Sequence, residues 1–368
     1  MKPKQMLRAA LLEHRERKID STIQKRVGEV CMQHPEWEKL TSDEEQYAYS
    51  DPHSLQIYKN IRHQMGYSIK PQYYVSDIRY RRKILSKLNY IDVSDMGFYA
   101  QSYTPFSDKN YQGFFIKQIK SPKAVIRNVN GVLFNEEFNA ISQESSFKIL
   151  DGYNTLVFKK SIGAGHGAGV RKVTSSECKE IIKTGEKNYI IQEILKQHES
   201  FAYYNESSVN VVRITTVNWK GTIYVLSGIM RIGAPGAFCD HLGMNGFGPL
   251  IIPIKQDGSL EKVAIDPDNA YIYNNVWGKE ISDKCFEYGE MVQAVKREHI
   301  KFPNYGILGW DMTLDVDGNI VCIEYNPYWP GVVQSQLACG EIFMQKTVDG
   351  NLLLDEILAE NLTGRAQR

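Results

Sequence analysis

The sequence feature that most constrains the fold is an acidic hairpin in residues 309–327. Asp317-Gly318 lies between two runs in which apolar and polar residues alternate, a pattern typical of a two-residue type I′ turn between antiparallel strands. In that register Asp311 lies directly opposite Glu324. Carboxylates paired in this way, with Cβ atoms roughly 5 Å apart, repel each other. We therefore expect a positive charge beside them.

The same alternation assigns each hairpin residue to one face of the sheet. Asn326 joins the two acids, with Thr313 and Cys322 on the same face. The core face is predicted to hold Met312 opposite Ile323, and Leu314 opposite Val321. Asp311, Glu324 and the Asn326 carbonyl are oxygen ligands without His or Cys, which suits Mg²⁺ that shares its coordination shell with phosphates. A hairpin with a solvated acidic face is the alternative interpretation.

Bulk composition sets limits on class and location. A chain of 368 residues favours two or three domains, and 44 Lys+Arg against 43 Asp+Glu give no general attraction to nucleic acid or anionic membranes. The six cysteines lack C-x-x-C pairs and metal-ligand spacing, which is typical of a reducing compartment. Without a signal peptide or an 18-residue apolar run, we expect a cytoplasmic protein that does not span a membrane. The sequence carries no signal for an oligomeric state.

The first part of the chain is predicted to be helical, because residues 1–65 are rich in charged helix formers. The basic and aromatic segment 73–83 is interpreted as a solvated helix face rather than an RNA contact, since the net charge gives no support for the latter. From residue 105 onward, strand signals at 124–134, 156–160 and 189–195 alternate with helix signals at 142–150 and 175–183. A small α+β unit is therefore expected there.

Two lysines precede candidate phosphate-binding elements. Lys109 lies in a loop, and Lys159 ends a strand that leads into a loop with glycine at every second position, namely Gly163, Gly165, Gly167 and Gly169. Backbone amides of such a loop can approach an anion closely. The pattern matches neither the Walker A loop nor the dinucleotide fingerprint, and an ordinary surface loop is the alternative.

Later strands supply further candidates. Gln192-Glu193 ends an apolar strand and is suited to the amino group of an adenine, although Glu193 could equally cap the strand. Strands 209–218 and 222–232 meet at Lys220-Gly221. A two-residue turn there places Asn210 opposite Arg231 and puts Arg213 on the other face, so the two arginines share a site only if a bulge or bend intervenes. A helix over 282–299 is then expected before the hairpin.

The order of Lys109, Lys159 with its loop, Gln192-Glu193, Arg213, Arg231 and the acidic hairpin resembles the ATP-grasp superfamily. The runs 192–198 and 207–213, with Gly309-Trp310-Asp311, are similar to its sugar-transfer-associated branch. The resemblance covers roughly residues 105 to 340 and implies an α+β ATP-grasp fold. Its expected parts are a mainly helical N-terminal region (1–105), a small lid subdomain (106–194) and a large catalytic subdomain (195–368).

The resemblance also implies roles for the candidate residues. Lys109, Lys159 and the glycine-rich loop would hold ATP phosphates, Gln192 and Glu193 would contact adenine, and Asp311, Glu324 and Asn326 would hold Mg²⁺. Arg213 and Arg231, with Asn210, are the expected catalytic residues. Some relatives carry an arginine where this chain has Gly309, and we expect Arg231 to do that work instead.

The implied activity is that of an ATP-dependent carboxylate-amine ligase, which forms an amide through an acyl phosphate. Its expected partners are a small-molecule carboxylate and an amine. The family association alone adds the expectation that one of them is linked to a sugar in cell-surface glycan synthesis. Two alternatives stay open: a small-molecule kinase that uses the same site, and a non-catalytic nucleotide-binding subunit.

Overall fold

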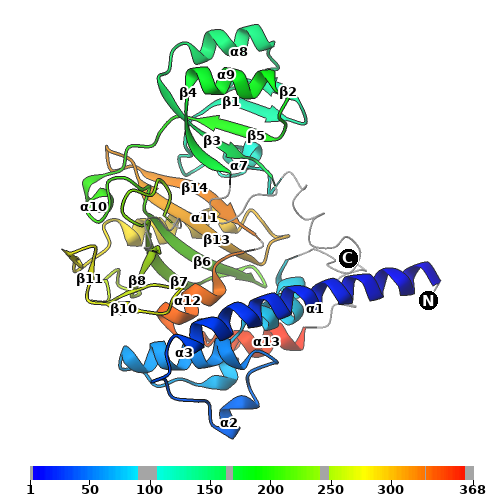
Figure 1. Cartoon of the computed structure of the whole chain (residues 1–368), viewed down its shortest axis with the longest axis vertical. Coiled ribbons are helices and arrows are strands. Elements are labelled where there is room, and N and C mark those ends of the chain that lie inside the picture. Colours follow the sequence, from blue (N-terminus) through cyan, green and yellow to red (C-terminus); the bar gives the residue numbers. More distant parts are fainter. Residues whose placement is uncertain (1–2, 90–105, 163–168, 241–247, 328, 361–368) are drawn as a thin grey trace.

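Two antiparallel sheets organise the chain, and a helical N-terminal region packs against the larger sheet (Figure 1). The computed structural model describes residues 3–89, 106–162, 169–240, 248–327 and 329–360. The predicted α+β class is confirmed, with helices first and the two sheets after them. No helix in these described segments combines the length and hydropathy needed to cross a bilayer.

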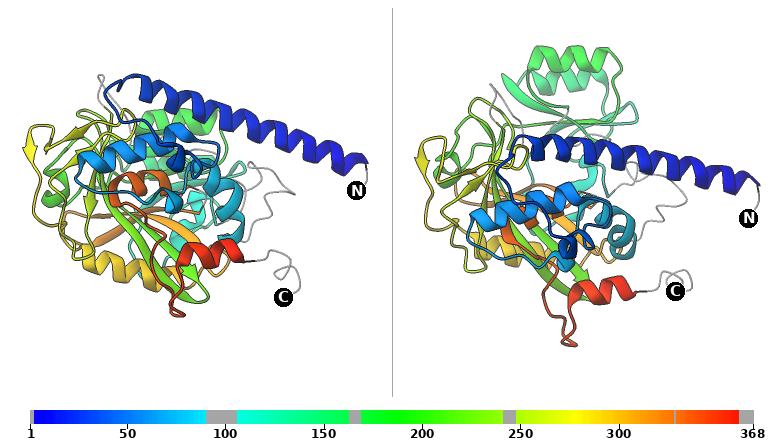
Figure 2. Two further views of the ribbon diagram at one scale, coloured as in Figure 1. Left: turned by 90° about the horizontal axis from the view of Figure 1, so that it is seen from below. Right: turned by 60° about the horizontal axis from the view of Figure 1, so that its bottom comes forward.

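The N-terminal region is helical, as predicted. Its elements are α1 (Pro3–Met32), α2 (Ser42–Glu45), α3 (Pro52–Gln64), the 3₁₀ turn η1 (Pro71–Tyr73), α4 (Asp77–Arg79), the π-helix η2 (Tyr80–Leu85) and α5 (Ser86–Leu88). The predicted helix start at residues 41–45 is confirmed by a capping box between Thr41 and Glu44. Helix α1 crosses this region and extends beyond the rest of the molecule at its N-terminal end (Figures 1 and 2).

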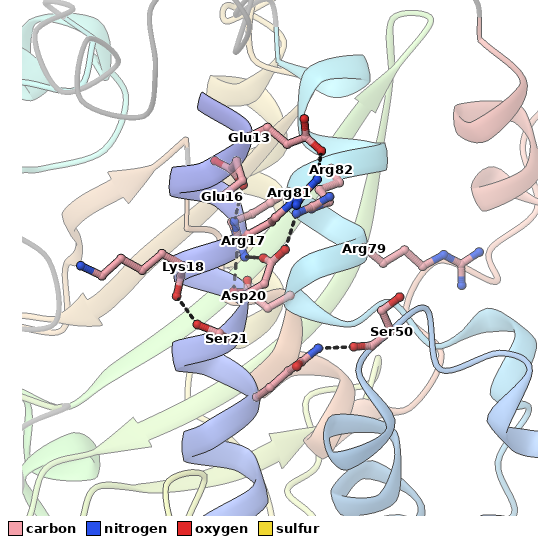
Figure 3. A network of polar contacts seen from close by, with 12 residues as sticks. Glu13, Glu16, Arg17, Lys18, Asp20, Ser21, Ser50, Arg79, Arg81 and Arg82 are labelled. Atoms are coloured by element: carbon pink, nitrogen blue, oxygen red, sulfur yellow. Dashed lines mark hydrogen bonds and ion pairs between the residues drawn. The ribbon is translucent and has the colours of Figure 1, made fainter. Parts of the chain in front are cut away.

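Charged residues of η2 attach α1 to the body (Figure 3). The side chain of Arg81 is 6% exposed and pairs with Glu16 at 2.9 Å, Asp20 at 2.7 Å and Asp77 at 3.4 Å. Arg82 also pairs with Asp20. The interpretation of segment 73–83 as a solvated face is therefore wrong at Arg81, because tertiary packing buries this arginine among carboxylates of two helices.

The smaller sheet has the strand order β2-β1-β5-β3-β4. Its strands are β1 (Ala124–Val129), β2 (Val132–Phe134), β3 (Thr155–Lys160), β4 (Val170–Thr174) and β5 (Tyr189–Gln192). Helices α8 (Gln143–Leu150) and α9 (Ser175–Lys183), both at their predicted positions, cover one face around Phe158 and Ile191. Because side chains alternate along a strand, Lys159 and Gln192 lie on the other face.

The larger sheet has the order β10-β9-β8-β7-β6-β13-β14. Its strands are β6 (Val211–Trp219), β7 (Thr222–Ile232), β8 (Leu250–Ile254), β9 (Ala264–Ile265), β10 (Ile272–Tyr273), β13 (Ile307–Leu314) and β14 (Ile320–Asn326). A separate hairpin pairs β11 (Asn275–Val276) with β12 (Lys279–Glu280). Short helix α10 (Glu199–Ala202) precedes β6.

Helices cover both faces of the larger sheet. On one face α11 (Tyr288–His299) packs against residues such as Ile214, Met230 and Trp310; it begins six residues later than predicted. The other face packs against the N-terminal helices, α12 (Val332–Cys339) and α13 (Leu353–Ala359). The candidate site residues lie at one end of this second face.

Helix α7 (Lys109–Phe115) connects the two sheets. It packs against β1 and β5 of the smaller sheet and against β14 of the larger one. Its Gln112 amide donates to the Tyr325 carbonyl at 3.1 Å. Ile116 and Ile119, just after the helix, belong to the core of the larger sheet. The start of α7 is thereby held between the two sheets.

Candidate functional site

The two hairpin acids face each other as predicted. Asp311 of β13 is paired with Glu324 of β14. The route to this register differs from the prediction, because the turn contains three residues: Leu314 pairs with Ile320, and the Asp315 amide donates to the Asn319 carbonyl at 2.9 Å. Gly318 adopts φ +81°, which a three-residue hairpin loop with a left-handed residue requires. The predicted two-residue turn is therefore wrong.

A bulge at Ile323 restores the opposition of the acids, since Met312 pairs with Cys322 and Asp311 with Glu324. One consequence is a second correction. Cys322 is 1% exposed and belongs to the core with Met312, whereas Ile323 is only partly buried, the reverse of the predicted faces. The longer loop shifts the register of β14 by one residue, and the bulge shifts it back by one. Asp311 and Glu324 are therefore opposite each other despite the different turn.

Both predicted arginines reach Asp311. Arg213 of β6 lies opposite Asp311 and binds it through two parallel contacts, Nε to Oδ1 at 2.5 Å and Nη2 to Oδ2 at 2.8 Å. Arg231 of β7 places Nη1 3.5 Å from Asp311 Oδ1, and its Nη2 lies 2.8 Å from Asp240 Oδ2. Arg213, Arg231 and Asp311 are each 6% exposed. Asp311 is thus held between two guanidinium groups.

A second bulge explains why the arginines share one face. The Lys220-Gly221 turn is as predicted, with both residues at positive φ, but Thr216 pairs with Val225 and Thr215 with Ser227. Leu226 is therefore the extra residue, and beyond it Arg213 pairs with Ile229, two residues before Arg231. The predicted pairing of Asn210 with Arg231 is wrong, because Val211 occupies that place.

Asn210 lies at the start of β6, and its side chain serves the local fold. The amide is 0% exposed and donates to the carbonyls of Phe201 and Asn205 at 2.8 and 2.9 Å. Its oxygen accepts a short hydrogen bond from Ser208. These contacts close the loop between α10 and β6, and they use both N–H groups of the buried amide.

The segment after β14 approaches the sheet at Gly309 and Arg213. A Cβ atom on Gly309 would lie 2.7 Å from the Pro330 backbone, and one on Gly331 would lie 3.0 Å from Arg213 Nη1. The Thr215 hydroxyl donates to the Pro330 carbonyl at 3.0 Å. A side chain at position 309 would therefore displace this segment, which accounts for a glycine there.

Lys109 comes from the first position of α7, after an Asp108 cap whose side chain accepts from the Asn110 amide. Its Nζ lies 2.8 Å from Glu324 Oε2, and its backbone amide donates to the Ser161 carbonyl at 3.0 Å. This ion pair joins residues 215 positions apart in the sequence. It connects helix α7, which packs against the smaller sheet, with the acidic hairpin of the larger one.

Electrostatic interactions place Lys159 in the same group. Burial lowers the pKa of Lys159; Glu324 opposes this shift, and the nearby charge of Lys109 adds to it. Burial alone would raise the pKa of Glu324, but Lys109, Lys159 and Arg213 outweigh it and lower this pKa. Glu324 therefore stays ionised, with three cations around it.

Gln192 and Glu193 lie farther along the smaller sheet. Gln192 is 7% exposed and donates to the Pro122 carbonyl at 3.2 Å, but its buried side-chain oxygen accepts no hydrogen bond from the described part of the chain. The Glu193 carboxylate accepts from Lys123 at 2.9 Å and from the Tyr153 hydroxyl at 3.1 Å. The side-chain oxygen of Gln192 can thus accept a further hydrogen bond, whereas the Glu193 carboxylate already binds Lys123 and Tyr153.

Most of the glycine-rich loop lies outside the described residues, and this applies to Gly163, Gly165 and Gly167. Gly169 is described, has φ +83°, and its carbonyl accepts from the Lys160 amide at 3.2 Å. A Cβ atom at Gly169 would lie 3.0 Å from the Lys160 side chain. The positive φ favours glycine at this position, and a Cβ atom would require a small shift of the Lys160 side chain.

The donor set of the hairpin fits a hard divalent cation. Within the described segments no group of three or more His, Cys, Asp or Glu could hold a metal, and the hairpin offers two carboxylates with an amide. The Asn326 NH₂ donates to Asp311 Oδ2 at 3.2 Å, so the Asn326 carbonyl points away from that oxygen. The Lys109 ammonium beside Glu324 shows that a cation is stable there. Oxygen donors of this kind suit Mg²⁺.

Asp240 pairs with Arg231 and begins the stretch 240–249, whose glycines are typical of a loop that lines an active site or of one that merely connects strands. That pattern was the only available signal for Asp240. Its partner lies on a neighbouring segment, so the pair became visible only in three dimensions.

One family model agrees with the resemblance seen in the sequence. A family model described as "Sugar-transfer associated ATP-grasp" matches residues 172–349. Among solved structures, the chain is similar to an L-amino acid ligase from Bacillus licheniformis, with 14% identity, 70% of this chain and 49% of that chain covered, and a TM-score of 0.38. This chain thus spans about half the length of that ligase.

Two further structures show the same low level of likeness. D-alanyl-alanine synthetase A from Vibrio cholerae O1 biovar eltor has 10% identity, coverage of 69% and 66%, and a TM-score of 0.40. The VanG D-Ala:D-Ser ligase from Enterococcus faecalis has 15% identity, coverage of 60% and 52%, and a TM-score of 0.35. No conclusion about substrates rests on likeness at this level. A search of curated protein sequences gives no match.

Proposed function

We propose that the protein is an ATP-dependent carboxylate-amine ligase, on the premise that residues 172–349 match the family model described as sugar-transfer-associated ATP-grasp. The observation that carries the proposal is the Lys109–Glu324 ion pair at 2.8 Å. It brings a cation from helix α7, which packs against the smaller sheet, to the acids of the larger sheet. The divisions 1–105, 106–194 and 195–368 are kept as proposed boundaries of the three parts.

The nucleotide would lie between the two sheets. Lys109 and Lys159 would bind its phosphates, and the glycine-rich loop that follows β3 would cover them. The open, buried oxygen of Gln192 would accept a hydrogen bond from the adenine amino group. Glu193 holds Lys123 and Tyr153 instead, so in this proposal it orients the end of β5.

Asp311, Glu324 and Asn326 would hold Mg²⁺, which would neutralise phosphate charge. Because Nε and Nη2 of Arg213 both donate to Asp311, Arg213 would act as a positioning residue for that carboxylate. Arg231 lies between the carboxylates of Asp240 and Asp311, with Nη1 at the longer distance of 3.5 Å. It is therefore the arginine we assign to an incoming anion, either the transferred phosphoryl group or a substrate carboxylate.

The reaction we propose has two steps. An oxygen of the donor carboxylate attacks the γ-phosphorus, its new O–P bond replaces the bond to ADP, and the lysines and Arg231 stabilise the charge on the phosphoryl oxygens. The amine nitrogen then attacks the acyl carbon, the C–O bond to phosphate breaks, and the amine loses a proton as the amide forms. Water would be excluded while the acyl phosphate exists.

The test is a panel of amino acids and sugar acids, each paired with amines that include amino sugars, screened for ADP release by the full chain. For an active pair, oxygen-18 in the donor carboxylate should appear in the released phosphate. A phosphorylated product without free phosphate would instead establish a kinase. ATP binding without turnover for any pair would favour the non-catalytic alternative.

A matched pair of variants ties activity to the site. Lys109→Met should abolish measurable ADP release, because it removes the cation beside Glu324. Lys117→Met changes an exposed lysine just after the same helix. The Lys117 ammonium lies 5.0 Å from the Phe114 ring centre. The activity of this variant should match that of the unmodified protein. Equal activity of both variants would contradict the assignment of Lys109.

A further inference from the structure

A pocket of about 450 Å³ lies apart from the residues described above. Apolar side chains form its floor, namely Phe201, Tyr204, Met230, Leu260 and Cys285. Each of them is 6% exposed or less. The volume is that of a small-molecule site.

The pocket and the candidate active site lie on opposite sides of β7. Met230 points to the α11 face of the sheet and packs in its core, whereas its neighbour Arg231 points to the face of Asp311. The loop between α10 and β6, closed by Asn210, contributes Tyr203 and Tyr204 to the pocket. No lining residue belongs to the set proposed for nucleotide or metal, so this is a second site.

The rim of the pocket combines aromatic rings with carboxylates. Tyr203 is 43% exposed and Phe286 is 48% exposed, so both rings are accessible at the rim. The rim carboxylates, Glu199 and Glu206, are exposed, and no hydrogen bond or ion pair of their side chains is found in the described parts of the chain. Lys284 belongs to the lining and Lys279 lies beside the Tyr203 ring, so two lysines accompany the two carboxylates at this rim.

One contact at this rim shows that an ammonium group can lie against an aromatic ring. The Lys279 ammonium lies 5.4 Å from the Tyr203 ring centre. Phe286 stacks one face on His198, with the ring centres 5.2 Å apart and the planes 3° from parallel, which leaves its other face as the exposed one. Aromatic faces attract cations because their quadrupole is negative above the ring.

We propose that this pocket binds a small organic ammonium ion. The free face of Phe286 and the two unpaired carboxylates would contact the cationic head, and the apolar floor would receive its hydrocarbon part. This inference is independent of the proposed ligase activity, because its residues lie on the other side of β7 from Arg231.

The probe is choline, compared with 3,3-dimethylbutan-1-ol, an alcohol of the same shape in which carbon replaces the charged nitrogen. Binding to the full chain is measured by calorimetric titration, with ATP titrated in parallel. We expect saturable choline binding at least about tenfold tighter than that of the alcohol. Equal affinities, or no saturable choline binding, would overturn the proposal.

Variants locate the site. The double substitution Glu199→Gln/Glu206→Gln and, separately, Phe286→Leu should each weaken choline binding at least about fivefold, with unchanged ATP affinity and melting temperature. Glu290→Gln, an exposed acid on α11 outside the lining, is the matched control and should bind choline normally. Choline binding that survives the double substitution would also refute the proposal. If the unmodified protein binds choline but does not bind ATP, the proposed nucleotide site is refuted and the ammonium site is not.

Discussion

Arg213 and Asp311 lie opposite each other on β6 and β13 and form a two-point ion pair, with contacts of 2.5 and 2.8 Å and both side chains less than 10% exposed. Such a pair is expensive to break from one side, since the remaining charge stays buried. It also fixes the carboxylate plane, because a planar guanidinium matches a carboxylate at both oxygens. The pair therefore makes predictions for stability as well as activity.

Removing Arg213 should destabilise the protein more than removing the pair. We expect Arg213→Met to lower the free energy of unfolding by about 3–5 kcal/mol, because Asp311 is left buried with one guanidinium at 3.5 Å. Arg213→Met/Asp311→Asn should recover at least ~1 kcal/mol of that loss. Chemical denaturation of the two single variants and the double variant measures the coupling. Strictly additive losses would argue against the pair.

The geometry of the pair should matter beyond its charge. Arg213→Lys keeps a cation but loses the two-point contact, so we expect ADP formation by an active substrate pair to fall by about 10² or more. Arg297→Lys makes the same exchange at an exposed position on α11 and should leave the rate unchanged. A rate for Arg213→Lys that equals the control would show that charge alone suffices.

Glu324 should contribute to acid stability. Its pKa is lowered from the ordinary 4.5 because Lys109, Lys159 and Arg213 outweigh burial. The carboxyl releases its proton more readily in the folded state, so its contribution is present above pH 4.5 and is lost as the pH falls below that value. Denaturation of the unmodified protein and Glu324→Gln between pH 7 and 3 tests this. The stability difference between them should shrink toward low pH, and a constant difference would contradict the argument.

His299 should add a second pH dependence. It is 0% exposed beneath Trp310, with Nδ1 2.7 Å from the Thr216 hydroxyl and Nε2 2.8 Å from the Tyr305 carbonyl. Burial lowers its pKa from 6.5 to about 4. The unfolded chain therefore binds the proton first, and about 3 kcal/mol of stability, present above pH 6.5, is lost as the pH falls to 4.

A variant without the imidazole isolates that effect. His299→Gln cannot titrate, so its free energy of unfolding should depend less on pH between 6.5 and 4.5 than that of the unmodified protein. Parallel denaturation curves at several pH values measure both slopes. Identical slopes would mean that the buried imidazole does not couple to folding.

The attachment of α1 should depend on Arg81. Arg81→Ala leaves the carboxylates of Glu16, Asp20 and Asp77 without this partner, and we expect a local loss of roughly 2–3 kcal/mol, less than for a fully buried pair because those acids are partly exposed. Amide hydrogen exchange in α1 should accelerate. Arg17→Ala, which breaks an exposed pair with Glu13 in the same helix, should have almost no effect. Similar exchange in both variants would contradict this role.

Local patterns in the sequence determined much of the fold and one half of the site. The alternation of the hairpin puts Asp311 and Glu324 on one face, and local patterns locate α8, α9, the strands β1 to β3 and β5 to β7, and the hairpin strands β13 and β14. These features depend on residues that are neighbours along the chain. The spacing of apolar residues along a strand or helix therefore predicts which side chains share a face.

Tertiary structure alone decided how the halves of the site meet. The bulge at Leu226 puts Arg213 and Arg231 on one face, and the bulge at Ile323 offsets the longer hairpin loop. Neither is evident from strand alternation, because a bulge adds one residue without a distinct pattern and is selected by the packing of both faces. Likewise, Lys109 reaches Glu324 only because α7 packs against both sheets, a contact between distant segments that local periodicity does not encode.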